Sequence, residues 1–185
     1  MRGRRSDLWA GHGAVQREGP VIRLAETDSS AMRNERIEVR RATASDAADI
    51  APLYLHFLQS YGHAAERSAV VRFLADLLPE PWVLFFVAID TPKKVVGFTG
   101  CVLTYSAVSQ ALALTINDMF VAATARRRGI ATALCRAIEA HARRNGFAKI
   151  FLETAPDAEA AIGLYRKFGF EARPYLAMTK EFNDA

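Results

Sequence analysis

The sequence has few cysteines and no long apolar run. It contains two cysteines in 185 residues, no CxxC pair, and no stretch near the roughly 18 apolar residues of a membrane-spanning helix. Cys101 stands in a strand-like run and Cys135 in a helix-like run, so we expect two buried thiols rather than a disulfide or a zinc site. The N-terminus has arginines but no apolar core, and it includes five acidic residues, which disfavours a secretory signal or a transit peptide. We therefore expect a soluble, reduced, cytoplasmic protein that holds no metal.

The common nucleotide-binding loops are also missing. Neither GxxxxGK[ST] nor GxGxxG occurs, which removes the best support for an NTPase or a simple dinucleotide-binding protein. The formal charge of +4 suits an anionic ligand without selecting nucleic acid, a cofactor or a membrane surface. Because no basic–aromatic interleaving and no recognised nucleic-acid module accompany that charge, we expect no nucleic-acid and no membrane partner.

The apolar periodicity predicts one ordered domain, residues 36–185, which follows a flexible extension, residues 1–35. Met32 is a possible alternative first residue of the protein, since the ordered pattern begins just after it. Helical spacing predicts four helices, and Pro52 implies that the first either kinks or starts late. The other three cover about 70–78, 128–145 and 156–168. Strand-like runs occupy 36–42, 82–89, 94–105, 111–121, 148–154 and 173–182. This order predicts an α/β protein of the α+β type, with a mixed, mostly antiparallel sheet of about six to seven strands and one parallel crossover.

The segment from Asn117 to Ala142 combines a strand, a short loop and the start of a helix. Three arginines precede Gly129 and Ala131 there. The first N–H groups of a helix have no intrahelical partner, and the positive end of the helix dipole lies beside them. Cations at such an end oppose the dipole, so they favour an anionic ligand. Arg126 to Thr132 are therefore predicted to form a phosphate-binding turn.

Two motifs in this chain resemble those of the GNAT superfamily of N-acetyltransferases. Arg126-Arg-Arg-Gly129-Ile-Ala131 is similar to its acetyl-CoA signature, R/Q-x-x-G-x-G/A. Ala160 to Phe170 is similar to its second motif, A-x-x-x-L-Y-x-K-x-G-F. The resemblance covers about residues 36–181 and implies a fold that splays two central strands apart to hold acetyl-CoA. It implies direct acetyl transfer to a primary amine of a small molecule in a ternary complex, with acetyl-CoA as co-substrate.

The resemblance also assigns residues that bind the co-substrate. Backbone amides and arginine side chains of the turn would hold the pyrophosphate, from Arg126, Arg127, Arg128, Gly129, Ile130, Ala131 and Thr132. Backbone groups of Met119, Phe120 and Val121 would pair with the pantetheine arm. One position departs from the family, which often has Asn seven residues before the motif tyrosine, where this chain has Ala158. Either that bond is lost or Asp157 substitutes, although Asp157 is equally a helix cap.

The resemblance implies that Tyr165 is the general acid that protonates the departing thiolate. The alternative is that Tyr165 is a buried aromatic residue that packs its helix against the sheet. Asp118 is the candidate base or amine anchor, and the alternative is a carboxylate bonded to loop amides. Strict alternation places Asp118 on an apolar face with Ile116 and Phe120, and a β-bulge, which the family shows here, would change that facing. Glu153 or a water chain remains open as the base.

The acceptor side of the reaction is less defined. His63 follows the break between the first two helices, a region that borders the acceptor site in this family, although a loop histidine is more often merely exposed. Tyr61, Tyr105 and Tyr175 either line that pocket or pack. Polyamines, amino acids, antibiotics and protein amines are all open as acceptors. The alternative function is a non-catalytic CoA-binding module on the same fold. A homodimer is also open.

Overall fold

The structure, a computed structural model, describes residues 22–23, 37–90, 93–174, 176–180 and 182. The chain divides into two compact units, residues 1–153 and residues 154–185. The first unit holds the sheet and most of the helices, and the second holds one helix. Each unit is described by itself.

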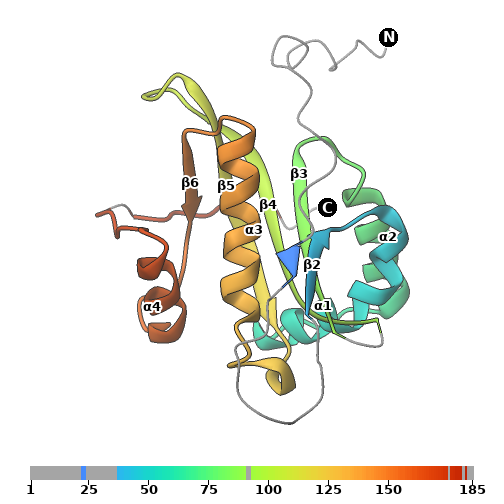
Figure 1. Cartoon of the computed structure of the whole chain (residues 1–185). Coiled ribbons are helices and arrows are strands. Elements are labelled where there is room, and N and C mark those ends of the chain that lie inside the picture. Colours follow the sequence, from blue (N-terminus) through green and yellow to red (C-terminus); the bar gives the residue numbers. More distant parts are fainter. Residues whose placement is uncertain (1–21, 24–36, 91–92, 175, 181, 183–185) are drawn as a thin grey trace, which may run out of the picture. The chain divides into compact units, whose positions relative to one another are not determined.

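The first unit contains a six-stranded sheet in the spatial order β1-β2-β3-β4-β5-β6 (Figure 1). Its strands are β1 (Ile22–Arg23), β2 (Glu38–Arg41), β3 (Val83–Asp90), β4 (Lys94–Ser106), β5 (Ala111–Val121) and β6 (Lys149–Leu152). Neighbours from β1 to β5 pair antiparallel, whereas β5 and β6 pair parallel. The prediction of a mixed, mostly antiparallel sheet with one parallel crossover is therefore confirmed.

The helices of this unit are α1 (Ala47–Ser60), α2 (Arg67–Leu77) and α3 (Ile130–Arg144), with short 3₁₀ turns at Ala44–Asp46 and Ala123–Ala125. The Asp46 carboxylate accepts the Thr43 N–H at 2.8 Å and the Arg40 guanidinium at 2.6 Å, which stabilises the start of α1. Because α1 begins at Ala47, ahead of Pro52, the predicted alternative of a late start is wrong.

Two predictions along the chain differ from the structure. Helix α3 begins at Ile130 and not near Arg128, because Arg127 (φ 64°) and Gly129 (φ 78°) have left-handed backbone that a helix cannot include. Ile22 and Arg23 pair with β2, although they fall in the extension predicted to be flexible. The rest of that extension lies outside the described residues, so the boundary at residue 36 stays a prediction.

The predicted last strand, residues 173–182, is wrong. Its described residues, 173–174, 176–180 and 182, have no regular structure. They belong to the second unit, whose one regular element in the described chain is helix α4 (Glu159–Lys167). A strand needs a neighbour to accept its hydrogen bonds, and Pro174 also lacks the N–H that a ladder uses.

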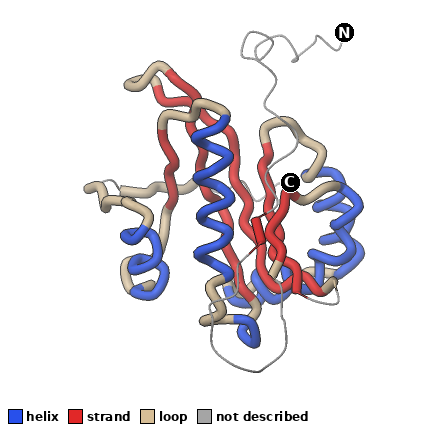
Figure 2. Tube along the Cα trace, in the orientation of Figure 1, coloured by secondary structure: helices blue, strands red, loops and turns tan. Residues whose placement is uncertain are grey.

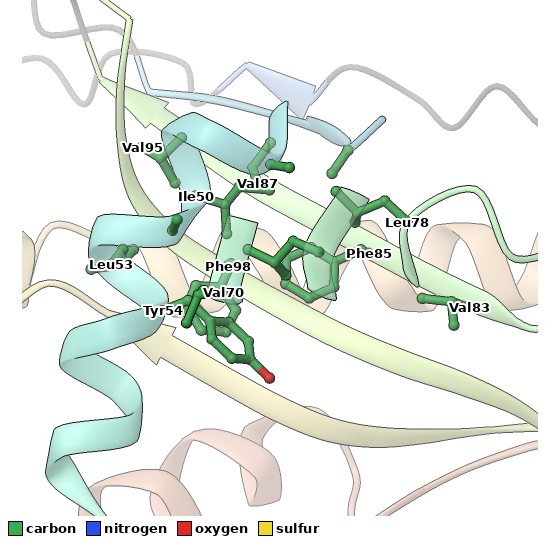
Figure 3. Close-up of a cluster of buried hydrophobic side chains, with 14 residues drawn as sticks. Ile50, Leu53, Tyr54, Val70, Leu78, Val83, Phe85, Val87, Val95 and Phe98 are labelled. Atoms are coloured by element: carbon green, nitrogen blue, oxygen red, sulfur yellow. The ribbon is translucent and has the colours of Figure 1, made fainter. Parts of the chain in front are cut away.

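The two faces of the sheet carry different helices. A Cβ added at Gly97 of β4 would lie 2.8 Å from Ile130, so α3 approaches the sheet closely on that face. The adjacent Phe98 points to the opposite face, where its ring stacks on Tyr54 of α1 at 5.4 Å and on Phe85 of β3 at 5.4 Å. Figure 2 shows α3 lying lengthwise along the sheet, and Figure 3 shows the apolar cluster beneath α1 and α2. The sheet is thus covered on both faces, as predicted.

None of the helices in the described part of the chain combines the length and the apolar character that crossing a membrane requires. Both cysteines are buried free thiols, as expected, and burial raises the pKa of each.

Candidate active site

A β-bulge near the end of β5 determines where Asp118 points. Asp118 pairs with Gly100 of β4, but Cys101 pairs with Ile116, so Asn117 is an extra residue in β5. The extra residue reverses the facing of the residues that follow it. Ile116 shares the α3 face with Cys101, whereas Asp118 shares the opposite face with Phe98. The bulge expected here is therefore present, and strict alternation would have placed Asp118 on the wrong face.

The Asp118 carboxylate lies in a desolvated, aromatic environment. A Cβ built on Gly100 would meet the Phe85 ring at 3.1 Å and Asp118 Oδ2 at 3.3 Å, so the absent side chain of Gly100 leaves room for the carboxylate. Burial raises the pKa of Asp118. Burial and then the charge of Asp118 raise the pKa of the Tyr54 hydroxyl to about 12. The hydroxyl is therefore protonated at neutral pH and lies near enough to sense the carboxylate.

The surroundings of Asp118 bear on its two predicted roles. Its backbone carbonyl accepts the Thr99 hydroxyl at 2.8 Å, which anchors the strand beside the bulge. No hydrogen bond or ion pair reaches its carboxylate from any described residue. The alternative of a carboxylate bonded to loop amides has no support in the described chain.

Four aromatic rings contact one another on the sheet face that carries Asp118, and the outermost of them is exposed. The ring of Phe57 lies 5.5 Å from that of Tyr54, 5.8 Å from that of Phe120 and 5.1 Å from that of Tyr61. Tyr54 is buried, Phe57 and Phe120 are half-buried, and Tyr61 is 70% exposed. We call these four residues, Tyr54, Phe57, Tyr61 and Phe120, the aromatic wall. Of them, sequence analysis had identified only Tyr61 as a pocket residue and Phe120 as a backbone ligand.

The end of β5 extends beyond its pairing with β6. Pairing with β6 ends at Ile116 and Leu152, while β5 continues along β4 to Val121. Ala122 donates its N–H to the Val96 carbonyl of β4, so by alternation the backbone groups of Val121 and Met119 point away from β4. Because β6 itself ends at Leu152, the splaying of the two strands that the resemblance implied stays a prediction.

The predicted phosphate turn has the geometry of an anion site. Gly129 caps α3, and the first helical hydrogen bond runs from the Ala133 N–H to the Gly129 carbonyl at 3.0 Å. The N–H groups of Ile130, Ala131 and Thr132 therefore have no acceptor in the helix. Apart from its two chain neighbours, no described residue has an atom within 4 Å of a Cβ added at Gly129, so a ligand has room beside this backbone.

The three arginines before Gly129 have different surroundings. Arg128 forms an ion pair with Asp90 at the end of β3, with 2.8 Å between Nη1 and Oδ2. Arg126 donates from Nε to the Val121 carbonyl at 3.3 Å, and Arg127 is exposed. Arg126 and Arg128 thus have different partners, a strand carbonyl and a carboxylate. Sequence analysis missed Asp90, whose only signal was an acidic residue that ends an apolar strand.

The second unit contains Tyr165, on α4. Its half-buried ring lies 5.6 Å from the Phe170 ring in an edge-to-face arrangement. Ala158 is the N-cap of α4 and makes no side-chain bond there, and Asp157 is exposed. Because the two units are described separately, Tyr165 is not placed relative to Asp118, and its role as general acid stays a prediction.

The other predicted residues are dispersed. His63 lies in the turn after α1 and is exposed, as are Glu153 and Tyr105, the last of these by 73%. Tyr175 lies outside the described residues. Within the described ranges, no group of three or more His, Cys, Asp and Glu side chains is arranged to hold a metal ion.

Comparison with known proteins identifies the family. The model of the acetyltransferase (GNAT) family matches residues 50–170. The uncharacterized N-acetyltransferase YhfO of Bacillus subtilis is 31% identical over 135 residues, which cover 73% of this chain and 90% of that protein. The crystal structure of a probable acetyltransferase aligns with a TM-score of 0.72 at 24% identity, over 83% of this chain and all of its own.

An aminoglycoside N-acetyltransferase solved in complex with CoA shares the fold, with a TM-score of 0.68 at 15% identity over 82% of this chain and 99% of its own. The expectations of the fold and of the enzyme class are confirmed by these matches. The chain belongs to the acetyltransferase (GNAT) family.

Proposed function

We propose that this protein transfers the acetyl group of acetyl-CoA to a primary amine of a small molecule, by direct attack within a ternary complex. The observation that carries the proposal is the Asp118 carboxylate, which the bulge directs to a desolvated aromatic face and which has no partner among the described residues. A carboxylate with a raised pKa is a better proton acceptor from an ammonium group than an ordinary exposed one.

The co-substrate is held by main-chain groups. The N–H groups of Ile130, Ala131 and Thr132 at the start of α3 bind the pyrophosphate, supported by the helix dipole. The outward-facing edge of β5 at Met119 and Val121 pairs with the amides of the pantetheine arm, in the manner of an added strand. The aminoglycoside N-acetyltransferase of the same fold was solved in complex with CoA, which supports CoA as the group that this fold binds.

The chemistry requires three proton transfers. Asp118 takes a proton from the ammonium group of the acceptor, so that the neutral nitrogen attacks the thioester carbonyl carbon. The new C–N bond forms as the C–S bond breaks, and the leaving sulfur takes a proton from the Tyr165 hydroxyl. The acetylated nitrogen loses its second proton, which restores the Tyr165 hydroxyl through solvent. A positioned acid or base typically contributes about 10²- to 10⁴-fold to the rate.

Binding of the co-substrate is tested by isothermal titration with CoA. Gly129→Val places a side chain where the ligand approaches, so it should abolish binding. Gly146, at φ 69° after the other end of α3, provides the matched control because Gly146→Val introduces comparable left-handed strain far from the turn. Equal affinities for the two variants would contradict the proposed site, and absence of CoA binding to the wild type would overturn the function.

Turnover is tested with a panel of amines and a readout of released thiol. Intersecting initial-velocity lines are expected for a ternary complex, whereas parallel lines would indicate an acetyl-enzyme. Asp118→Asn should remove the acidic limb of the pH profile, which should lie above the range of an ordinary carboxyl group because burial raises the pKa of Asp118. Tyr165→Phe should lower kcat more than it raises the KM for acetyl-CoA, and unchanged turnover would assign Tyr165 to packing.

A further inference from the structure

The loop that joins β5 to α3 is fixed to the sheet at both of its ends. Ala122 donates its N–H to the Val96 carbonyl of β4 at 2.9 Å. At the other end Ile130 is buried, and its Cγ2 atom would lie 2.8 Å from a Cβ added at Gly97. Residues 126–129 connect the two anchors. Because the Ile130 N–H belongs to the peptide group that follows residue 129, its direction depends on the backbone of that segment.

The segment between the anchors has an unfavourable backbone. Arg127 (φ 64°) and Gly129 (φ 78°) both lie in the left-handed region, which glycine adopts readily and arginine does not. A non-glycine residue stays in that region only where its surroundings hold it there. Arg128, which stands between the two, forms the ion pair with Asp90 at the end of β3. The pair therefore ties the strained segment to a strand 38 positions earlier in the chain.

The charge of Asp90 is unexpected beside a site for an anion. A carboxylate near a pyrophosphate repels it, so Asp90 by itself opposes binding of the ligand. Its partner Arg128 is neutralised by the pair, and the two side chains are only 15% and 30% exposed. The pair thus contributes a mechanical restraint to the turn and little net positive charge.

We propose that Asp90 is a positioning residue for CoA, which acts through Arg128 to hold the turn in the conformation that binds the pyrophosphate. The inference rests on the proposed binding of acetyl-CoA at this turn and adds a residue outside it. It also predicts the direction of an effect. Asp90→Asn removes a negative charge near an anion, so electrostatics alone would tighten CoA binding, whereas loss of the restraint weakens it.

Isothermal titration with CoA measures that direction. Asp90→Asn should raise the Kd by about three- to fivefold, because fewer molecules have the turn preformed. Fivefold corresponds to about 1 kcal/mol, the upper range for a partly exposed ion pair. Glu139→Gln is the matched control, because Glu139 is also paired with an arginine, Arg143, near the other end of α3. It removes the same charge and should leave the Kd unchanged.

The design separates positioning from loss of folded protein. Circular dichroism at the titration temperature checks that each variant is folded, and a partly inactive preparation would lower the stoichiometry of the titration but not raise the Kd. Asp90→Glu keeps a carboxylate for Arg128, so it should bind CoA more tightly than Asp90→Asn. If Asp90 acted only through its charge, the order of these two variants would be reversed.

A double variant tests whether Asp90 acts through Arg128. Asp90→Asn combined with Arg128→Gln should bind CoA as tightly as Asp90→Asn alone, because both changes remove the same restraint. If the double variant binds more weakly, Arg128 is itself a phosphate ligand and the positioning role is overturned.

The outcomes distinguish this inference from the function on which it rests. Failure of the wild type to bind CoA overturns the proposed function. If the wild type binds CoA, an unchanged or lower Kd in Asp90→Asn overturns the positioning role alone, and so does an equal rise in Asp90→Asn and Glu139→Gln.

Discussion

The buried histidine of α3 provides a sharp test of how the structure converts burial into pH dependence. His141 is 1% exposed and lies between the rings of Phe86 and Phe147, each 6.1 Å away. Neither ring nitrogen has a hydrogen-bond partner in the described chain. Burial, and then the positive charges of Arg41 and Arg144, lower the pKa of His141 from 6.5 to about 4.

The size and sign of the effect follow from linkage. Below pH 6.5 the unfolded chain binds a proton at this histidine, whereas the folded protein does not bind it until about pH 4. His141 therefore has no effect on the pH dependence of the unfolding free energy above pH 6.5. As the pH falls from 6.5 toward 4, His141 progressively lowers the unfolding free energy. A shift of that size corresponds to about 3 kcal/mol of unfolding free energy, at about 1.4 kcal/mol for each pKa unit.

His141→Leu should remove this dependence. At pH 7 the variant should be as stable as the wild type or more stable, because an apolar side chain replaces two unpaired ring nitrogens. At pH 4.5 it should be more stable by about 2–3 kcal/mol, most of the full linkage effect. Urea unfolding followed by circular dichroism at pH 7, 6, 5 and 4.5 measures the difference in unfolding free energy between the two proteins. The titration of carboxylates affects both proteins alike, so it cancels from this difference.

A matched control is His56→Gln, which removes an exposed imidazole from α1 and leaves His141 in place. That variant should retain the acid sensitivity of the wild type. Parallel stability curves for wild type and His141→Leu would refute the reasoning, because they would mean that His141 titrates alike in the folded and unfolded states.

Two further substitutions test the structure around the site. Gly100→Ala places a methyl group about 3 Å from the Phe85 ring and Asp118 Oδ2, and overpacking of this kind costs about 1–3 kcal/mol. It should lower the thermal midpoint and also lower kcat by about tenfold or more if the displaced carboxylate is the base, so a normal kcat would argue against that role. For the ion pair of Asp90 and Arg128, which are 15% and 30% exposed, a double-mutant cycle with Asp90→Asn and Arg128→Gln should give a coupling free energy of about 1 kcal/mol. Zero coupling at low salt would show that the pair does not stabilise the turn.

Features that depend only on residues close together in the sequence could be predicted from the sequence. The buried stripe of α3, its stop at Gly146 and the two motifs around Gly129 and Tyr165 each depend on a few neighbouring positions. The helix order and the three-strand run followed from periodicity alone. The failure at residues 173–182 has the same origin, because alternation shows that a segment can form a strand but not that a neighbouring strand exists.

Features that depend on register could not be predicted in this way. The bulge at Asn117 exists only in the pairing of β4 with β5, and neither strand alone reports it. The Asp90–Arg128 pair joins residues 38 positions apart. The aromatic wall brings side chains from α1 and β5 to one place, whereas the periodicity of each element indicated only that they were buried.

The stability of Asp118→Asn distinguishes a functional carboxylate from a structural one. Burial raises the pKa of Asp118 in the folded protein, so the folded state binds a proton more tightly than the unfolded chain. The protonated Asp118 therefore contributes fully to stability below the pKa that it has in the unfolded chain. That contribution is lost as the pH rises through the pKa that it has in the folded protein. At pH 7 the ionised group is a cost, which Asp118→Asn removes. The variant should have a higher urea midpoint than the wild type at pH 7, and little difference at pH 3.

The same variant should lose acetyl transfer while it gains stability, because the neutral amide accepts no proton from the ammonium group. A carboxylate retained at a cost to the fold is expected where catalysis requires it. If Asp118→Asn instead lowers the midpoint at pH 7, the carboxylate has a stabilising partner in solution. The base would then have to be sought at Glu153 or in bound water.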